Sequence, residues 1–154
     1  KPFNTDALLK KIDNIIDTRN RFKTYLATQN ITIDVIKHYT AFDQKIISKI
    51  VETIHLHLDD PEYSVEDLAL EIGLSRMQLH RKLKTLIGQT TTSFINSIRI
   101  SQARYLFDNG CNRIQEAMVA VGISSYSHFN ITFKKIVGIS PSEYIKKQQQ
   151  LAKM

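Results

Sequence analysis

The chain has 154 residues and a formal net charge of +6, from 21 Lys and Arg against 15 Asp and Glu. Hydrophobic residues make up 42% and charged residues 23%, with 5 Gly and 3 Pro, which excludes disordered, collagen-like and low-complexity chains. The apolar runs are too short for a membrane span, and Cys111, the only cysteine, excludes a disulfide framework and a multi-cysteine zinc site. We therefore expect a soluble, basic, cytoplasmic protein.

Helical periodicity dominates the whole sequence, and no segment alternates convincingly like a strand. Capping residues and helix breakers divide it into eight expected helices, with residues 30–40 as a linker after the first. These helices cover approximately residues 5–29, 41–58, 65–71, 75–88, 92–108, 114–121, 124–137 and a last segment from Ser140-Pro141 onward.

The spacing of apolar residues also predicts which helix faces are buried. The second helix has a stripe at every fourth position, and the later helices have apolar residues three and four apart. The predicted buried residues are Phe42, Ile46, Ile50, Ile54 and Leu58; Leu79, Leu83 and Leu86; Phe94, Ile95, Ile98, Ala103, Leu106 and Phe107; and Phe129 and Phe133.

A helix-turn-helix pattern begins at Ser64, which has Asp67 three residues later, as in a capping box. Gly73 supplies a left-handed turn, and Ser75 caps a basic helix. Positive charge is concentrated in this half of the chain, because residues 61–154 hold 12 basic and 7 acidic residues, a net of +5. A short helix, a glycine turn and a basic helix are typical of a DNA-binding unit.

The pattern returns about 50 residues later, with Gly122 as the turn and Ser124 as the expected cap of a second recognition helix. The helix-turn-helix units span about 64–88 and 113–138. Joined by one helix, they can place two recognition helices in successive major grooves about 34 Å apart. The paired positions are Gly73 with Gly122, Leu74 with Ile123, Ser75 with Ser124 and, after a slip of one residue, Leu79 with Phe129, Leu83 with Phe133, Gly88 with Gly138 and Phe94 with Tyr144.

Several motifs between Phe42 and Tyr144 carry a family resemblance. They are Gly73-Leu74-Ser75-Arg76, Leu79-His80-Arg81-Lys82-Leu83-Lys84, Arg99-Ile100, Gly122-Ile123-Ser124, His128-Phe129, Phe133-Lys134-Lys135 and Ser140-Pro141-Ser142-Glu143-Tyr144. Together they resemble the AraC/XylS family of bacterial transcription regulators. The resemblance implies an all-α, homeodomain-like DNA-binding domain over residues 41–154 and a sequence-specific transcription regulator that acts as an activator.

The sequence departs from the family pattern at a few positions. Ala117-Met118 stands where the family usually has Ile-Ala, Ile123 replaces a Phe, and Thr91 replaces a Pro. Ile131 stands where many members carry a basic residue, which weakens the expectation that the second unit reads bases through a charged contact.

The N-terminus carries a second resemblance. Lys1-Pro2-Phe3, followed by Leu8-Leu9 and Ile12, is similar to the last loop and helix of a response-regulator receiver domain. Residues 1–29 then resemble the receiver end of hybrid sensor-regulators, which join kinase, receiver and AraC-type domain in one chain. This resemblance implies the output domain of a two-component system, with the phosphoacceptor aspartate and any kinase upstream of Lys1. Such a full-length hybrid can be membrane-anchored with this domain inside the cell.

Polar side chains on the recognition helices are the candidates for base contacts. Arg81 is the first of them, because a guanidinium can bond O6 and N7 of guanine together. The family's positions add His80 and Met77 beside it, with a place in the core as an open alternative for Met77. On the second helix they give Ser127, His128 and Ile131, and Ile131 can touch only a thymine methyl.

Cationic residues and helix starts are the candidates for phosphate contacts. For Lys134 and Lys135, stabilisation of their helix C-terminus is an open alternative. The phosphate candidates are Ser64, Arg76, Lys84, Ser124, Tyr126, Lys134 and Lys135.

No catalytic motif, cofactor motif or metal site is expected. His55 and His57 point in different directions on a helix, and no sequence signal gives Cys111 a partner base. The expected partner is double-stranded promoter DNA, with RNA polymerase as a further one. The alternative is a helical interaction module that binds a protein partner without specific DNA affinity. Apolar residues of the first helix also allow pairing with a second copy, through Ile12, Ile15, Phe22 and Leu26.

Overall fold

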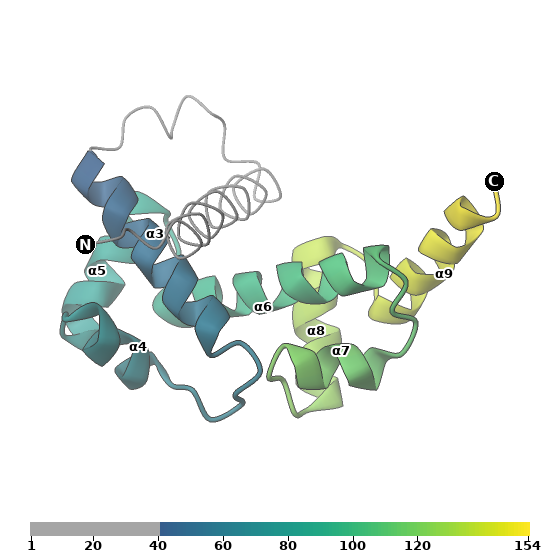
Figure 1. Cartoon of the computed structure of the whole chain (residues 1–154), viewed down its shortest axis with the longest axis horizontal. Helices are drawn as coiled ribbons and strands as arrows, with labels where there is room; N and C mark the ends of the chain where they lie inside the picture. Colours follow the sequence, from purple (N-terminus) through teal and green to yellow (C-terminus); the bar gives the residue numbers. More distant parts are fainter. Residues whose placement is uncertain (1–40) are drawn as a thin grey trace, which may run out of the picture. The chain divides into compact units, whose positions relative to one another are not determined.

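The computed structural model describes residues 41–154, and the receiver-like segment, the linker and the pairing residues predicted within residues 1–40 lie outside them. The described part forms seven helices and no strand, which confirms the all-α fold (Figure 1). None of these helices is long and apolar enough to cross a bilayer. The helices are α3 (Ala41–Leu56), α4 (Val65–Ile72), α5 (Arg76–Leu86), α6 (Thr91–Asp108), α7 (Ile114–Ala120), α8 (Tyr126–Val137) and α9 (Pro141–Ala152).

The described residues fall into two parts, with the boundary between Glu52 and Thr53 inside α3. The predicted burial of the apolar stripe of α3 is wrong at its first residue, because Phe42 is 66% exposed. Positions four apart drift by about 40° per step around a helix, so a stripe through Ile50 has left the buried face by Phe42. The residues buried in and just after α3 are Ile47, Ile50, Val51, Thr53, Ile54 and Leu58.

The second part is organised around α6, its longest helix (Figure 1). α6 packs against α5 and also against α7, α8 and α9. α4 packs on α5, and α7 packs on α8. We call α4 and α5 HTH-1, and α7 and α8 HTH-2. A single connecting helix therefore supports both helix-turn-helix units, as the repeat predicted.

The predicted buried faces of this part are confirmed, except that Leu86 and Leu106 are only half-buried. Under HTH-2 the core is aromatic. The ring centroid of Phe133 lies 5.8 Å from Phe107, 5.8 Å from Phe129 and 5.7 Å from Tyr144. Burial of one Phe side chain stabilises a fold by about 1.5–3 kcal/mol, so this cluster holds α8 and α9 onto α6.

Serine and threonine caps set where most of these helices begin. Ser64 and Ser75 form capping boxes with Asp67 and Gln78, and Ser140 caps α9 with Pro141 in its first turn, all as predicted for the serines. The predicted cap of α8 was wrong, because Ser125 and not Ser124 accepts the backbone N–H bond. The cap follows Gly73 by two residues and Gly122 by three, so the turn of HTH-2 is one residue longer.

Candidate nucleic-acid interface

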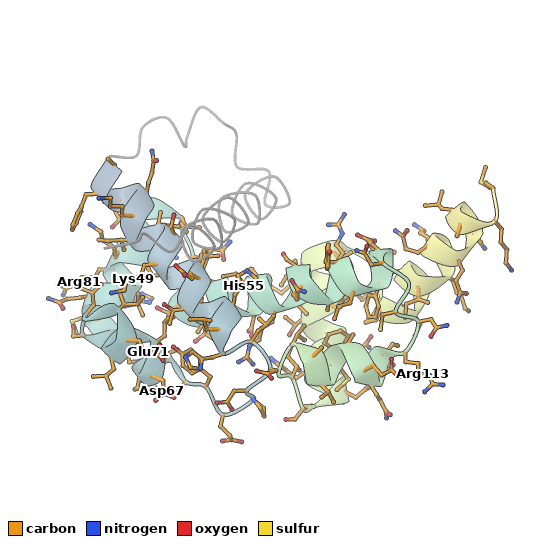
Figure 2. The ribbon with its side chains drawn as sticks, in the orientation of Figure 1. Lys49, His55, Asp67, Glu71, Arg81 and Arg113 are labelled. Atoms are coloured by element: carbon orange, nitrogen blue, oxygen red, sulfur yellow. The ribbon has the colours of Figure 1, made fainter. Side chains whose placement is uncertain are left out.

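One face of α5 gathers four of the predicted contact residues. Leu79 and Leu83 are fully buried and fix the opposite face against the core. The four residues follow the spacing i, i+3, i+4 and i+7, which places them on a single stripe. All four are exposed, and Arg81 lies on the outer side of the helix (Figure 2). They are Met77, His80, Arg81 and Lys84.

α8 repeats this arrangement at an offset of 50 residues, set by the caps Ser75 and Ser125. Phe129 and Phe133 are fully buried, so the stripe of α8 faces outward in the same way. Ile131, at the position of Arg81, is 68% exposed. The other predicted residues of α8 are exposed as well: Tyr126, Ser127, His128, Lys134 and Lys135.

The offset also identifies a residue that sequence reasoning missed. Asn130 occupies the position of His80 and is half-buried, and its amide is the group that pairs with adenine in the major groove. The repeat that pairs Leu79 with Phe129 already has an offset of 50 and pairs His80 with Asn130, so the signal that could have found this residue was present in the sequence. His128 corresponds instead to Gln78, whose side-chain oxygen accepts the Ser75 N–H at 2.9 Å.

Of the two phosphate contacts predicted at helix starts, Ser64 already has a hydrogen-bond partner within its own helix. The Ser64 N–H and hydroxyl both donate to the Asp67 carboxylate, at 3.0 and 2.8 Å. These bonds lower the pKa of Asp67, so the start of α4 already carries a carboxylate. Ser124 is exposed in the turn before the cap. Both residues remain predictions as phosphate contacts.

Arg76, at the first position of α5, joins the two helices of HTH-1. Its Nη1 lies 2.6 Å from Oε1 of Glu66 in α4, and both side chains are exposed. An exposed pair of this kind contributes at most about 1 kcal/mol, so Arg76 can exchange Glu66 for a phosphate.

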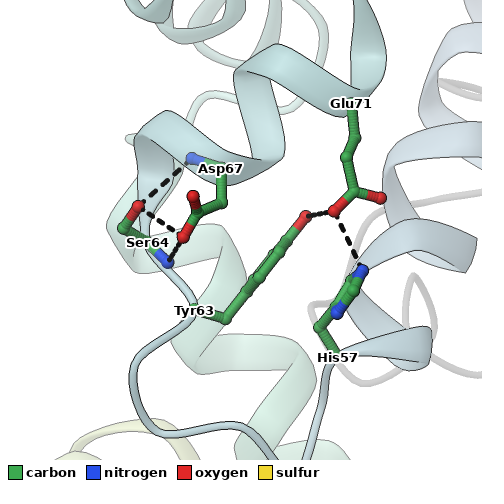
Figure 3. A network of polar contacts seen from close by, with 5 residues as sticks. All are labelled: His57, Tyr63, Ser64, Asp67 and Glu71. Carbon is green, nitrogen blue, oxygen red and sulfur yellow. Dashed lines mark hydrogen bonds and ion pairs between the residues drawn. The ribbon is translucent and has the colours of Figure 1, made fainter.

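A second polar network holds the loop before α4 (Figure 3). The rings of His57 and Tyr63 stack with centroids 4.2 Å apart. His57 Nε2 lies 2.9 Å from Oε1 of Glu71, and the Tyr63 hydroxyl donates to the same oxygen at 3.1 Å. Burial and this bond to Glu71 raise the pKa of Tyr63, so its hydroxyl stays protonated. The network fixes the entry into HTH-1 and is a structural feature.

The recognition helices and α4 differ in their content of acidic residues. α5 and α8 contain no acidic residue, whereas α4 contains Glu66, Asp67 and Glu71. The exposed faces of the recognition helices are therefore positive or neutral and attract a polyanion. Among the described residues, no group of His, Cys, Asp and Glu is placed to hold a metal ion.

The profile of the helix-turn-helix domain family matches residues 68–147, from within α4 through α5, α6, α7 and α8 into α9. One curated relative is histidine kinase P4 of Formosa agariphila, 28% identical over 145 residues, which cover 94% of this chain and 10% of that protein. The next two curated relatives are also longer, and this chain spans 33% and 60% of their lengths.

Solved structures of the same fold include transcription regulators. One is a transcriptional regulator of Chromobacterium violaceum with an AraC-type DNA-binding domain; it is 27% identical, with a TM-score of 0.64 over 72% of this chain and 98% of that one. Another is the C-terminal domain of the response regulator AraT of Geobacillus stearothermophilus; it is 25% identical, with a TM-score of 0.60 over 66% of this chain and 84% of that one.

Proposed function

Because this chain belongs to the AraC-type helix-turn-helix family of DNA-binding transcription regulators, we propose that α5 and α8 read the two halves of one promoter site. The observation that carries this proposal is the repeated stripe, which is exposed at every position except the half-buried Asn130. Residues 77, 80, 81 and 84 of α5 correspond to residues 127, 130, 131 and 134 of α8, and the opposite face of each helix is buried. Each stripe is long enough for three or four side chains to reach base edges.

The two stripes differ in what they recognise. Arg81 donates two hydrogen bonds to O6 and N7 of a guanine, with His80 and Met77 beside it. In α8, Asn130 pairs with an adenine, Ser127 and His128 form hydrogen bonds, and Ile131 packs on a thymine methyl. HTH-1 thus prefers a guanine where HTH-2 prefers a thymine.

Affinity without sequence preference comes from phosphate contacts. We assign these to Arg76, Lys84, Lys134 and Lys135, which are exposed at the two ends of the recognition helices. Ser64, Ser124 and Tyr126 supply neutral hydrogen bonds to the same backbone. Neutralised phosphates release counterions, so binding weakens as salt rises.

The place of this domain in a longer protein is a further part of the proposal. The relative from Formosa agariphila is a histidine kinase and aligns with 94% of this chain, including residues before α3. AraT is a response regulator, and its C-terminal domain has this fold. We assign the chain to the output end of a two-component system, where it activates transcription beside RNA polymerase.

The test is selection from a randomised pool of double-stranded DNA at two salt concentrations, followed by sequencing. We expect a two-part motif whose halves lie about one helical turn apart. The Arg81→Ala variant, carried through the same selection, should lose one position of the half read by HTH-1 and keep the other half.

Three other outcomes would contradict parts of this proposal. Enrichment of a single half would mean that HTH-2 does not discriminate. Salt-sensitive binding without enrichment would remove the sequence-specific function of this chain on its own. An absence of binding at low salt would favour a helical module that binds a protein partner.

A further inference from the structure

A buried arginine joins the two helix-turn-helix units away from their DNA-facing stripes. Arg99 lies in the middle of α6 and is only 8% exposed. Its Nη1 donates to the carbonyl oxygen of Gly122 at 2.8 Å, and its Nη2 donates to the carbonyl oxygen of Asp60 at 3.0 Å. These acceptors lie 23 and 39 residues away in the sequence.

The two acceptor carbonyls lie at different helix-turn-helix units. Asp60 lies in the loop before α4, which opens HTH-1. Gly122 lies in the turn between α7 and α8 of HTH-2. Figure 1 shows this loop beside this turn, so one guanidinium holds together two backbone segments that α6 alone would leave separate.

Gly122 brings these segments into direct backbone contact. A Cβ at this position would lie 2.5 Å from the carbonyl oxygen of Leu58 and 3.2 Å from the carbonyl carbons of Asp59 and Asp60. Backbone atoms cannot move aside as a flexible side chain can. The equivalent Gly73 has a similar φ of +83°, against +69° at Gly122, but no atom within 4 Å of its Cβ position. The close approach is therefore specific to HTH-2.

The charge of Arg99 strengthens this junction. Burial lowers the pKa of Arg99, and the nearby Asp60 carboxylate opposes that shift. Hydrogen bonds from an ionised donor are roughly twice as strong as neutral ones. The remaining Nε is buried without a partner among the described residues, so the two Nη bonds are what fix the side chain.

We propose that Arg99 is a positioning residue that, with Gly122, fixes the separation of the two recognition helices and so determines which spacing between half-sites the protein accepts. This inference rests on the proposed two-part reading of DNA. α6 sets the distance between the units along its axis. The junction prevents rotation of HTH-1 against HTH-2 about that helix.

The first test measures the separation of the units without DNA. Spin labels are attached to the full chain through Thr85→Cys in HTH-1 and Gln115→Cys in HTH-2, with Cys111→Ser as background, because both label sites are exposed. The distance distribution should be narrow in this parent. It should broaden in Arg99→Lys, whose single ammonium replaces two donor nitrogens, and in Gly122→Ala.

Two matched controls separate this effect from general damage. Arg104→Lys makes the same substitution on the same helix, but Arg104 bonds the Tyr144 hydroxyl at 3.1 Å and does not join the two units. Gly73→Ala introduces the same strain at positive φ without the backbone clash. Both controls should keep the narrow distribution of the parent.

The second test uses DNA sites whose halves are moved apart or together by one base pair at a time. The unsubstituted chain should bind one spacing best. Arg99→Lys should lose about tenfold in affinity for that spacing, equivalent to one charged hydrogen bond, and should discriminate less among the others. Its affinity for an isolated HTH-1 half-site should change by less than about twofold, because Arg99 is not on the DNA-facing stripe.

The outcomes separate the two proposals. An Arg99→Lys variant with a lower melting temperature but unchanged distance distribution and spacing preference would overturn the positioning role and leave a purely stabilising one. An unsubstituted chain that binds every spacing equally would overturn the two-part reading of DNA. The spin-label distances would still decide whether Arg99 fixes the two units.

Discussion

Arg81 and Ile131 occupy the same place in the two proposed recognition helices, and the difference between them defines the chemistry of the proposed interface. Both are exposed, and both lie opposite a buried leucine or phenylalanine face. A guanidinium discriminates guanine through two hydrogen bonds, whereas an isoleucine discriminates only through contact with a methyl group. We therefore expect the stronger sequence preference in the half-site read by HTH-1.

The first prediction concerns Arg81. The Arg81→Ala variant should lose about 1–3 kcal/mol of binding free energy at the preferred site, because two hydrogen bonds to one base are removed. The loss should be smaller on sites that already lack that base. Measurement of dissociation constants over a set of single-base variants checks this.

Lys84→Ala is the matched control, one helical turn further along the same stripe. It should weaken specific and random DNA by the same factor, because a phosphate contact carries no sequence information. If Arg81→Ala also weakened all sites equally, Arg81 would be a phosphate contact and the guanine assignment would be wrong.

At the scale of helices, much of the structure follows from local sequence signals. Apolar spacing and the caps Ser64, Ser75 and Ser140 placed the helices of the second part close to their observed bounds. The prediction of Ser124 as the cap of α8 was wrong. Its neighbour Ser125 has the same capping chemistry, and the length of the turn decides which of the two caps the helix. The junction through Arg99 depends on carbonyls 23 and 39 residues away, which periodicity does not encode.

The capping box of α4 gives a pH-dependent prediction. Hydrogen bonds from Ser64 lower the pKa of Asp67 in the folded state below its unfolded value. The ionised carboxylate therefore stabilises the fold above the unfolded pKa of about 4, and this contribution is lost as pH falls through the folded pKa. Asp67→Asn should remove it.

Urea unfolding of both proteins between neutral and strongly acidic pH checks this prediction. The stability difference between the unsubstituted chain and Asp67→Asn should be constant near neutrality and shrink below about pH 4. In a Ser64→Ala background the same difference should be smaller, because one bond to the carboxylate is missing. A difference that stayed constant down to low pH would mean that Asp67 is not stabilised by the box.

α7 offers the opposite case, because it begins without a side-chain cap. Arg113 occupies the N-cap position and makes no capping bond, and it projects into solvent (Figure 2). Its exposed contact with Glu116, at 3.4 Å, contributes little. Arg113→Ser would place a hydroxyl three residues before Glu116, which is the spacing of a capping box.

We expect Arg113→Ser to raise the unfolding free energy by about 0.5–1 kcal/mol, measured by urea denaturation. Arg113→Ala is the control, since it removes the same charge without adding a cap. Equal stabilities of the two variants would mean that the start of α7 cannot adopt the capping geometry.

At the scale of the whole molecule, positive charge and the repeat both support the proposed DNA interface. The four cations that we assign to phosphates are Arg76 and Lys84 in HTH-1, and Lys134 and Lys135 in HTH-2. Their number determines how steeply affinity falls with salt, since each neutralised phosphate contributes about −0.9 to the slope of log K against log salt. Four contacts predict a slope of about −4.

The last prediction divides this slope between the two units. Lys84→Ala should reduce its magnitude by about 1, and the double change Lys134→Ala and Lys135→Ala by about 2. Lys153→Ala, which removes an exposed charge at the end of α9, is the control and should leave the slope unchanged. If the double variant kept the full slope but unfolded at lower urea, Lys134 and Lys135 would act on the C-terminus of α8 instead. HTH-2 would then contribute shape and apolar contacts to recognition, and HTH-1 would supply nearly all of the electrostatic affinity.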